Sequence, residues 1–367
     1  MRTKAVTVVV LCLAGSSLAV SGGASVRAAS PPGVYTFDAS KNALKTLIPG
    51  GIEREDISWS SDGKWVASTN TDNFLVDVVP AAGGKRRAYG SLSWSPNGAR
   101  AAYTTRKGLI VSASNFQKPR LVTAQGSDGS IEWAPDSGAF TFGGRQPGTW
   151  LRVSRGDGTG VRKLWLPPSD GPGASWINDV SWSPSGRRLA LWVTINNAVA
   201  KRNGGEFVYL VSPDHPGARR LTYRAPDGLG FYRWSGDGKW LILRSEAALY
   251  RVSPAGGATQ AVCGLCVNAE LSPDGRRVAY VSRGGLWSAS VDSSGAQRIG
   301  DVPAQTEISW SADGRKLGLT LTASEDGPAR VAAVDLATNT IRPLTDGTKD
   351  EYLVGLSSTG LVKICSI

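Results

Sequence analysis

Short runs of apolar and β-branched residues recur along the whole chain, and polar turn residues separate them. A run such as 57–59 ends in tryptophan, a polar turn follows, and a second run such as 65–67 resumes the apolar pattern. Runs of this length, bounded by Ser, Pro, Asp and Gly, are typical of β-strands joined by tight turns. No segment keeps a helical apolar spacing, so we expect an all-β chain with almost no helix.

The turn is a recurring phrase of the type Ser-Trp-Ser-Pro-Asp-Gly. Its seven copies occupy 58–63, 93–98, 132–137, 181–186, 233–238, 270–275 and 309–314. Proline presets the backbone dihedral φ, aspartate accepts a hydrogen bond from the backbone two residues on, and glycine adopts positive φ without strain. Each copy is therefore predicted to be a tight hairpin between two strands.

Two further runs follow each hairpin, for example 110–114 and 120–122. Four short strands in a unit that recurs at steps of 35 to 52 residues are typical of the blade of a β-propeller. The tryptophans of the turn phrase are expected to pack between neighbouring blades, where their large apolar area is best used. Because the repeat extends over the chain after the first 29 residues, we predict a single domain, 30–367, rather than several.

The end of the chain carries a weaker eighth copy of the hairpin, at 354–364. The runs 34–38 and 45–47 near the start look like the third and fourth strands that this copy lacks. Pairing of the two ends in one composite blade would close the ring and cover exposed strand edges. We therefore predict eight blades, closed by N- and C-terminal strands that share one blade, with seven blades as the alternative.

These repeats resemble the TolB-like β-propeller family, whose signature is a tryptophan-serine-proline-aspartate-glycine turn followed by an aliphatic strand. The resemblance extends over essentially the whole of 30–367 and implies a propeller that binds proteins. It concerns the propeller only, and we expect no counterpart of the N-terminal α/β domain that TolB carries. The repeat also resembles the propellers that gate prolyl-oligopeptidase-type hydrolases, so the resemblance specifies the fold more sharply than the function.

Residues 1–29 differ from the repeats and are predicted to be a secretory signal peptide. Two basic residues precede an apolar stretch over 5–20, and small residues around 26–28 suit cleavage. The mature domain is then expected to be a soluble monomer, secreted or in the cell envelope. No other stretch is long and apolar enough to cross a bilayer.

The net charge of the chain is +11, and residues 1–29 contribute three of these units. A basic exported protein suits an anionic polymer surface or lipid head groups, although the same charge also serves solubility alone. Basic residues follow most of the turns, from Lys64 to Lys316, and are expected to form a ring on that side. The expected partner is an envelope or extracellular protein or glycan, and no nucleic-acid recognition motif is present.

Three cysteines lie outside the predicted signal peptide. Cys263 and Cys266 are spaced for a local disulfide, which export favours, whereas Cys365 is alone. Unpaired thiols are the alternative. Redox or metal chemistry would need a different surrounding fold or further ligands, and only His215 and Cys365 are there to add to the pair. We expect neither a metal nor another cofactor.

The single histidine, His215, lies in a predicted turn and restricts the available chemistry. A Ser-His-Asp triad would have to use it, and no G-x-S-x-G elbow is present. Carboxylates remain as acid–base candidates: Asp56, Asp179 and Glu307, with Asn268, lie three residues before the tryptophan position of their repeats. We expect this position at the mouth of the central channel, where like charges raise one another's pKa or hold a cation. Solvated strand ends are the alternative interpretation.

The long, irregular loops are predicted on the side of the ring opposite the repeated turns. Two of them, 165–179 and 194–206, are adjacent in blades three and four. Long loops on a rigid scaffold are where binding residues concentrate. The candidate binding residues there are Trp165, Trp176, Asn178, Asn196, Asn197, Lys201 and Arg202. Aromatic, amide and cationic groups suit a carbohydrate, peptide or protein surface, unless the two tryptophans only hold their own loop together.

Two functions follow from these observations. The first is a non-catalytic, protein- or ligand-binding scaffold. The second is a carboxylate-dependent lyase or hydrolase that acts on a polysaccharide or peptide in the central channel. The lack of a histidine-based site and of a nucleophile motif favours the first.

Overall fold

The computed structural model describes residues 7–12, 17–20, 24–27, 33–38, 43–48, 54–60, 62–70, 72–124, 131–144, 149–165, 175–195, 205–214, 218–221, 230–245, 248–292, 294–311, 313–322, 329–344, 351–356 and 362–366. Over these residues the chain is all-β, as predicted, and every regular element is a strand. In these ranges there is no helix with the length and apolar character that crossing a bilayer requires.

Within the described residues, seven of the four-stranded antiparallel sheets are each built from four consecutive strands in sequence order, and we number them blades 1 to 7. Blade 1 contains β6 (Arg54–Trp59), β7 (Trp65–Asn70), β8 (Val76–Pro80) and β9 (Arg87–Tyr89). Blade 2 contains β10 (Leu92–Trp94), β11 (Arg100–Thr105), β12 (Gly108–Ala113) and β13 (Arg120–Thr123). Blade 3 contains β14 (Ile131–Trp133), β15 (Ala139–Phe142), β16 (Leu151–Arg155) and β17 (Arg162–Trp165).

The second half of the chain continues the series. Blade 4 contains β18 (Ser175–Trp182), β19 (Leu189–Ile195), β20 (Gly205–Val211) and β21 (Ala218–Leu221). Blade 5 contains β22 (Gly230–Trp234), β23 (Leu241–Arg244), β24 (Ala248–Val252) and β25 (Gln260–Gly264). Blade 6 contains β26 (Val267–Leu271), β27 (Arg277–Ser282), β28 (Gly285–Ser290) and β29 (Gln297–Asp301). Blade 7 contains β30 (Glu307–Trp310), β31 (Lys316–Thr322), β32 (Ala329–Asp335) and β33 (Thr340–Pro343).

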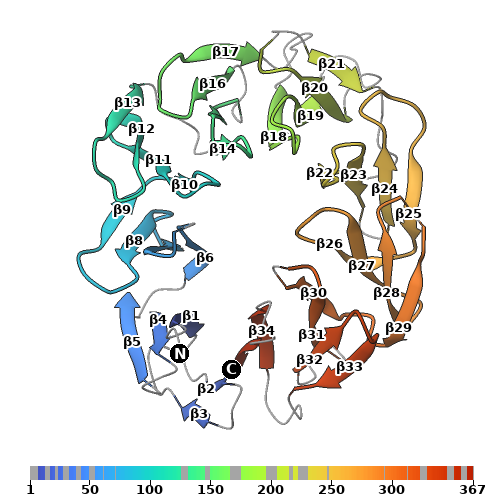
Figure 1. Ribbon diagram of the computed structural model, residues 1–367. Coiled ribbons are helices and arrows are strands. Elements are labelled where there is room, and N and C mark those ends of the chain that lie inside the picture. Colours follow the sequence, from blue (N-terminus) through green and yellow to red (C-terminus); the bar gives the residue numbers. More distant parts are fainter. Residues whose placement is uncertain are drawn as a thin grey trace.

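The blades stand side by side around a ring, with the first strand of each blade nearest the centre and the fourth at the outer edge (Figure 1). Because neighbouring strands are antiparallel, the turns between strands one and two and between strands three and four lie on one side of the ring. We call this side the turn face. The connections between strands two and three, and between successive blades, lie on the opposite side, which we call the loop face.

The repeated turn is held by four hydrogen bonds, shown here for blade 7. The Gly314 N–H donates to the Ser311 carbonyl at 2.8 Å, and the Ser311 hydroxyl donates to Asp313 Oδ1 at 2.7 Å. The N–H of Arg315 donates to the same carboxylate at 3.2 Å, and that of Lys316 donates to Ser311 Oγ at 2.9 Å. The predicted role of the turn aspartate as an acceptor from the backbone two residues on is therefore confirmed.

Three other blades repeat all four bonds, around Ser60 and Asp62, Ser235 and Asp237, and Ser272 and Asp274. The hydroxyl of Ser311 is the main reason that the pKa of Asp313 lies below its ordinary value, and the Arg315 N–H adds to it. These carboxylates thus serve to hold the turns of the scaffold.

The tryptophan column links blades 3, 4, 5 and 7 to the blade before each of them. Four indole nitrogens donate to the backbone carbonyl that precedes the corresponding position of the previous blade: Trp133 to Ser93 at 3.2 Å, Trp182 to Glu132 at 3.0 Å, Trp234 to Ser181 at 3.2 Å and Trp310 to Glu270 at 3.0 Å. A buried donor that finds an acceptor in this way avoids a penalty of about 1–3 kcal/mol. The expected packing of tryptophan between blades is confirmed.

The core lies between adjacent sheets. Between blades 3 and 4, Leu151 and Val153 of β16 pack with Leu189 and Leu191 of β19, and Trp182 covers one end of this cluster. These residues come from the apolar runs that the sequence pattern assigned to inner strands. Each blade is too thin to bury its apolar faces alone, so stability depends on stacking against neighbours.

A disulfide joins Cys263, in β25, to Cys266, in the connection to β26. Both cysteines are buried, and they belong to the apolar cluster between blades 5 and 6. The bond therefore ties the outer strand of blade 5 to the start of blade 6.

The strands at the two ends of the chain pair differently from the prediction. β34 (Glu351–Leu356) and β35 (Val362–Ser366) form the expected hairpin, and β4 (Gly33–Asp38) pairs with β5 (Ala43–Ile48). However, β35 pairs with β2 (Ser17–Val20), which continues into β3 (Ala24–Arg27), and β4 pairs with β1 (Thr7–Cys12). N- and C-terminal strands do share a sheet, but residues 17–27 take the place that was predicted for 34–47. An unpaired strand edge recruits any β-forming segment within reach, and the apolar residues before 28 supply one.

Candidate functional site

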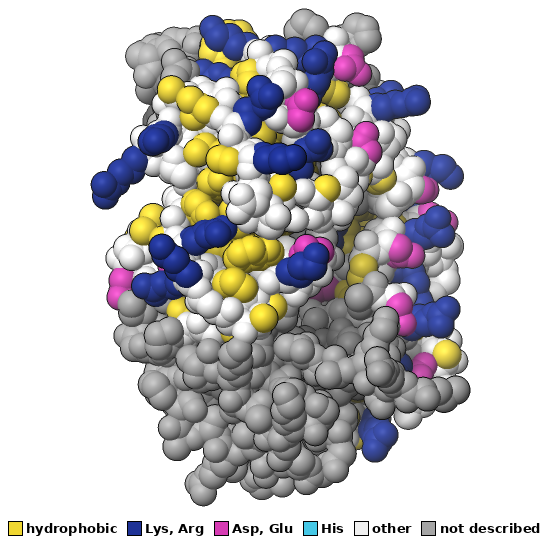
Figure 2. Space-filling model, turned by 60° about the vertical axis from the view of Figure 1, so that its left-hand side comes forward, with side chains coloured by type: hydrophobic (Ala, Val, Ile, Leu, Met, Phe, Trp, Pro, Cys, Tyr) yellow, Lys and Arg dark blue, Asp and Glu magenta, His cyan; other side chains and the backbone are white. Residues whose placement is uncertain are grey.

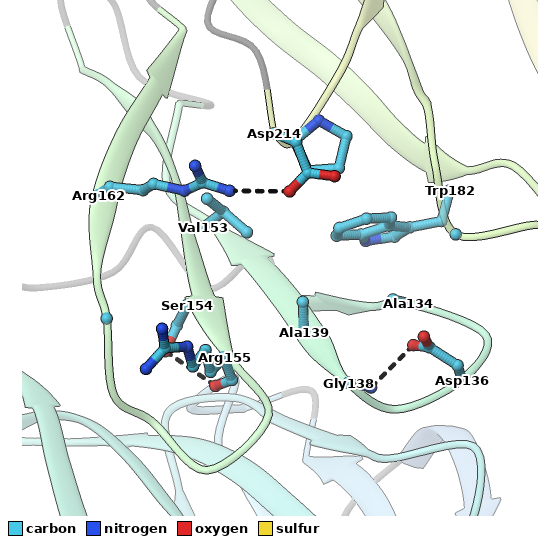
Figure 3. A pocket seen from close by; sticks show the side chains of 13 residues that line it. Ala134, Asp136, Gly138, Ala139, Val153, Ser154, Arg155, Arg162, Trp182 and Asp214 are labelled. Carbon is cyan, nitrogen blue, oxygen red and sulfur yellow. Dashed lines mark hydrogen bonds and ion pairs between the residues drawn. The ribbon is translucent and has the colours of Figure 1, made fainter.

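A pocket of about 550 Å³ opens on the turn face between blades 3 and 4 (Figure 3). Turns of both blades form its rim, and the apolar part of its wall comes from Ala134, Ala139, Val153 and Trp182. Its charged residues are Asp136, Arg155, Arg162 and Asp214. A pocket of this volume with a few convergent polar groups has the size of ordinary small-ligand sites.

Blade 3 departs from the repeat in the turn that lines this pocket. Ala134 replaces the serine of the phrase, and Ser137 replaces the glycine with a positive φ of 62°. Asp136 accepts the N–H of Gly138 at 2.8 Å, but no hydroxyl corresponding to that of Ser311 is present at position 134. The carboxylate of Asp136 is exposed and lies beneath Trp182 in Figure 3. It therefore keeps acceptor capacity that the equivalent aspartates spend on their own turns.

The side chain of Ser137 explains why this turn tolerates a non-glycine residue. Its Oγ accepts the N–H of Asn97 at 3.0 Å, which joins the turns of blades 2 and 3. The pocket between blades 3 and 4 is lined by Asp136 and Gly138 from the turn of blade 3 and by Gly186 from the turn of blade 4.

Two arginines and two aspartates line the pocket, and Arg162 points towards Asp214 (Figure 3). Arg162 Nη2 lies 3.4 Å from Asp214 Oδ1, so this ion pair bridges blades 3 and 4. Both side chains are about half exposed or more, and such a pair contributes at most about 1 kcal/mol, which a bound ligand can replace. Arg155 is exposed and forms no ion pair within the described residues.

The loop residues predicted as a binding site are only partly brought together. Trp165 is partly buried at the end of β17 and packs on Tyr209 of blade 4, with ring centroids 4.9 Å apart. Trp176 and Asn178 belong to β18, where the Trp176 indole donates to Asn178 Oδ1 at 2.8 Å. Asn178 in turn donates to Thr194 Oγ1 at 2.7 Å. The remaining four candidates, Asn196, Asn197, Lys201 and Arg202, lie outside the described residues.

Strand β18 begins earlier in the chain than the sequence suggested. Its partner β19 is seven residues long and pairs with β18 as far as Ser175, which lies opposite Ile195. Part of the segment predicted as a loop is therefore sheet, and Trp176 uses its polar atom within that sheet. The interpretation that the tryptophans hold local structure together accounts for both contacts.

The channel candidates lie on the first strands of different blades. Asp179 is in β18, Asn268 in β26 and Glu307 in β30. Asp179 Oδ1 accepts the N–H of Val180 at 2.9 Å, and Asn268 donates to the Thr306 carbonyl at 2.9 Å. Glu307 is exposed, and the backbone of Asp56 lies in β6 while its side chain is outside the described residues. His215 is also outside them.

The binding site predicted from the sequence lies on the loop face of blades 3 and 4, whereas the pocket lies on their turn face. The sequence also contained an indication of the turn face. The third copy of the phrase, which lines the pocket, has Ala134 and Ser137 in place of serine and glycine. Within the part of the chain that the structure describes, no three His, Cys, Asp or Glu side chains come together in an arrangement that could hold a metal ion.

Comparisons with known proteins place this geometry in context. No family model and no curated protein matches the chain. Many solved structures do share its architecture. The chain has a β-propeller fold.

Dipeptidyl peptidase 4 from Porphyromonas gingivalis has a TM-score of 0.60 at 11% identity, with 97% of this chain and 65% of that chain covered. An oligogalacturonate lyase in complex with manganese has a TM-score of 0.50 at 9% identity, with 86% and 97% covered. TolB from Acinetobacter baumannii also matches, with a TM-score of 0.37, 13% identity and coverage of 85% and 78%. At these identities the likeness concerns the fold alone.

Proposed function

We propose that this β-propeller is an exported, non-catalytic binding protein that holds a peptide segment of an envelope or extracellular partner in the pocket between blades 3 and 4. The observation that carries the proposal is Asp136, a turn aspartate that lacks its serine and faces a pocket containing arginine. A scaffold that repeats one turn with little change and alters it beside a pocket is expected to use the altered copy for recognition.

The chemistry of the pocket suits a peptide that carries both signs of charge. Asp136 is placed to accept a hydrogen bond from a lysine, an arginine or a free amine, whereas Arg155 is placed to pair with a carboxylate. Charge-assisted hydrogen bonds of this kind are about twice as strong as neutral ones. Between them, Val153 and the edge of Trp182 offer an apolar contact. A neutral glycan could offer hydroxyl groups to Asp136 and Arg155, but no partner of opposite charge to either.

A peptide display screen followed by calorimetry tests the proposal. We expect enriched peptides to combine a basic and an acidic residue, and Asp136→Asn to weaken their binding by about tenfold or more, as expected for the loss of one charge-assisted bond. Asn retains an oxygen that can accept the Gly138 N–H, so the turn should stay folded.

Asp313→Asn is the matched control, because Asp313 occupies the same position in blade 7 and is bonded by Ser311. Equal effects of the two substitutions, or enrichment of peptides without charge, would contradict the proposal. Enrichment of glycans from an array, with peptides inactive, would assign the pocket to a carbohydrate ligand instead.

Export and ring closure belong to the same proposal. Residues 1–29 have the pattern of a signal peptide, and their removal would leave β35 and β4 with one unpaired edge each. Pairing of these two edges would complete an eighth blade and a TolB-like propeller. Sequencing the N-terminus of the secreted protein would test whether cleavage occurs before residue 30.

A carboxylate-dependent lyase or hydrolase that acts in the central channel is the second candidate function. It is supported by the exposed Glu307 on the first strand of blade 7 and by the fold shared with an oligogalacturonate lyase. Turnover of a polysaccharide or peptide that disappears in Asp179→Asn or Glu307→Gln, but persists in Asp136→Asn, would favour this function over binding alone.

A further inference from the structure

Basic residues are concentrated in one part of the chain. Residues 78–127 contain eight lysines and arginines and no aspartate or glutamate, whereas the whole chain has 41 basic and 30 acidic residues. This segment therefore carries +8 of the net charge of +11. It forms the outer strand of blade 1 and all of blade 2.

We call these eight residues the basic strip: Lys85, Arg86, Arg87, Arg100, Arg106, Lys107, Lys118 and Arg120. Six of them are exposed, and only Arg87 and Arg100 are partly buried. Arg106 and Lys107 lie in the turn between β11 and β12 on the loop face, whereas Lys85 and Lys118 lie in turns on the turn face. The strip thus runs across the outer side of the ring, where Figure 2 shows Lys and Arg as the prevailing charged side chains.

The strip has fewer acidic neighbours than the basic residues of other turns on the turn face. Lys64 lies 3.4 Å from Asp62 of its own turn, and Lys239 lies 3.7 Å from Asp237. The turn of blade 2 has Asn97 at the aspartate position, and Asn97 makes the same bonds to Ser95 and Ala99 without a charge. In the basic ring expected around the turns, Lys64 and Lys239 are thus each paired with the aspartate of their own turn, whereas the turn of blade 2 offers no such carboxylate.

Acidic groups at the borders of the strip are few. Asp77 is buried beneath it and pairs with Arg86 at 3.4 Å. Asp157, in the next blade, has a pKa below its ordinary value because Thr159 donates two hydrogen bonds to it, and the charges of Arg100 and Arg120 add to this effect. The positive potential of the strip therefore reaches into blade 3.

One cation of the strip is held in a fixed orientation. The Arg87 guanidinium lies 5.2 Å from the ring centroid of Trp65 and 5.0 Å from that of Phe116. Its Nη1 is buried and has no hydrogen-bond partner within the described residues. A cation ordered in this way loses less conformational entropy on binding than a free lysine does.

We propose that the basic strip binds a linear polyanion with closely spaced phosphate or carboxylate groups. Charges that extend from one face of the ring to the other suit a flexible chain, which can follow a curved surface. A flat bilayer would reach only one face or one edge of the strip. Uncompensated charge of one sign also raises the local concentration of an anionic polymer and speeds its association. The proposal is independent of the peptide pocket, because the strip shares no residue with it.

Binding of labelled inorganic polyphosphate and of polygalacturonate to the purified protein tests this proposal, with dextran as the neutral polymer. We expect both anionic polymers to bind at about 50 mM salt and to dissociate steeply as salt rises, because binding releases counterions. The stronger of the two ligands identifies the anionic group that the strip prefers. Replacement of Lys85, Arg106, Lys118 and Arg120 by glutamine should weaken binding by several hundredfold, since each cation near an anionic surface contributes roughly a factor of five.

The matched control replaces Lys239, Arg276, Arg283 and Arg315 by glutamine. These four are equally exposed and lie in turns of blades 5 to 7, so both variants have the same net charge. Asn97→Asp provides a second test. Other copies of this turn fold with aspartate at the same position, so the substitution should preserve the turn and weaken polyanion binding by about threefold to fivefold.

Equal losses in the two quadruple variants would overturn the proposal, because net charge alone would then explain binding. Undiminished binding in the strip variant, or no binding of either anionic polymer by the unaltered protein, would overturn it as well. Vesicles containing phosphatidylglycerol that bind as tightly as the polymers, and lose binding in the same variant, would assign the strip to a membrane surface instead.

Discussion

Two pockets of nearly equal size open on the turn face, one of about 550 Å³ beside Asp136 and one of about 540 Å³ beside Asp313. Both aspartates occupy the same position of the repeated turn. Asp313 is bonded by the Ser311 hydroxyl and the Arg315 N–H, whereas Asp136 has alanine at the serine position and accepts only the Gly138 N–H from its own turn. A single missing hydroxyl therefore separates a structural carboxylate from one that can meet a ligand.

The residues that line the two pockets also differ, and again the first pocket is better suited to a ligand. Trp182 contributes an aromatic edge to the first pocket, while the second is lined mainly by charged residues and residues of tight turns. In the second pocket Asp335 also serves its own turn, because it accepts the Ala337 N–H at 2.9 Å. A repeat scaffold thus uses most of its polar turn groups for its own hydrogen bonds. Ligand binding is expected where one copy leaves such a group with free acceptor capacity.

The largest expected effect comes from the tryptophan beside the first pocket. Trp182 is only 8% exposed and packs in the cluster between blades 3 and 4. We expect Trp182→Ala to lower the free energy of unfolding by about 3–5 kcal/mol, as large-to-small core substitutions do. Trp310→Ala, at a partly buried position with the same indole hydrogen bond, should have a smaller effect in chemical denaturation. The reverse order would contradict the assignment of the core.

The serine of the regular turn comes next. Ser311→Ala removes the hydroxyl that accepts the Lys316 N–H and donates to Asp313. Because the site of the hydroxyl is fully buried, we expect the free energy of unfolding to fall by about 1–3 kcal/mol. Chemical denaturation measures this change, and a loss below about 0.5 kcal/mol would show that the hydroxyl does not hold the turn.

The converse substitution, Ala134→Ser, should make the first pocket resemble the second. The new hydroxyl would reach Asp136 as Ser311 reaches Asp313, and a net gain of about 1 kcal/mol in stability is expected for one such bond. Binding of charged peptides should weaken at the same time. Denaturation together with calorimetry would check both effects, and tighter peptide binding would argue against a role for the free carboxylate.

The smallest effect concerns acid stability. Because hydrogen bonds from Ser311 and Arg315 lower the pKa of Asp313 in the folded state, this group stabilises the fold above its unfolded pKa of about 3.9. The contribution disappears as the pH falls through the folded pKa. Carboxyl titration by NMR should show that Ser311→Ala raises the pKa of Asp313 and moves this loss to higher pH. A titration curve that Ser311→Ala leaves unchanged would exclude the hydroxyl as the cause.

Much of the fold could be predicted because its determinants are local. Proline, aspartate and glycine specify the turn within six residues, and the hydrogen bonds around Asp62 and Asp274 follow that expectation. The tryptophan column marks the contact between blades, as the bond from Trp234 to Ser181 illustrates. The end strands were harder to predict, since β35 can pair with any free edge that the fold brings near.

The candidate site was less predictable for a physical reason. Loop length drew attention to Trp165 and Trp176, whose contacts with Tyr209 and Asn178 depend on how far β18 and β19 pair. Pairing length is decided by the partner strand and not by the segment itself. Asp136 looks like the other turn aspartates in sequence, and only its neighbours Ala134 and Ser137 distinguish its turn.

The sequence by itself determined the strands, the hairpin turns, the order of the blades and the departures of single turns from the repeat, such as Ala134 and Ser137. These properties follow from backbone preferences and from hydrogen bonds between residues a few positions apart. Only the tertiary structure decided which end strands pair, that blades 3 and 4 leave a pocket between their turns, and that the basic residues of 78–127 are spread across one outer side. These properties depend on packing and charge between residues distant in sequence, which no local pattern encodes.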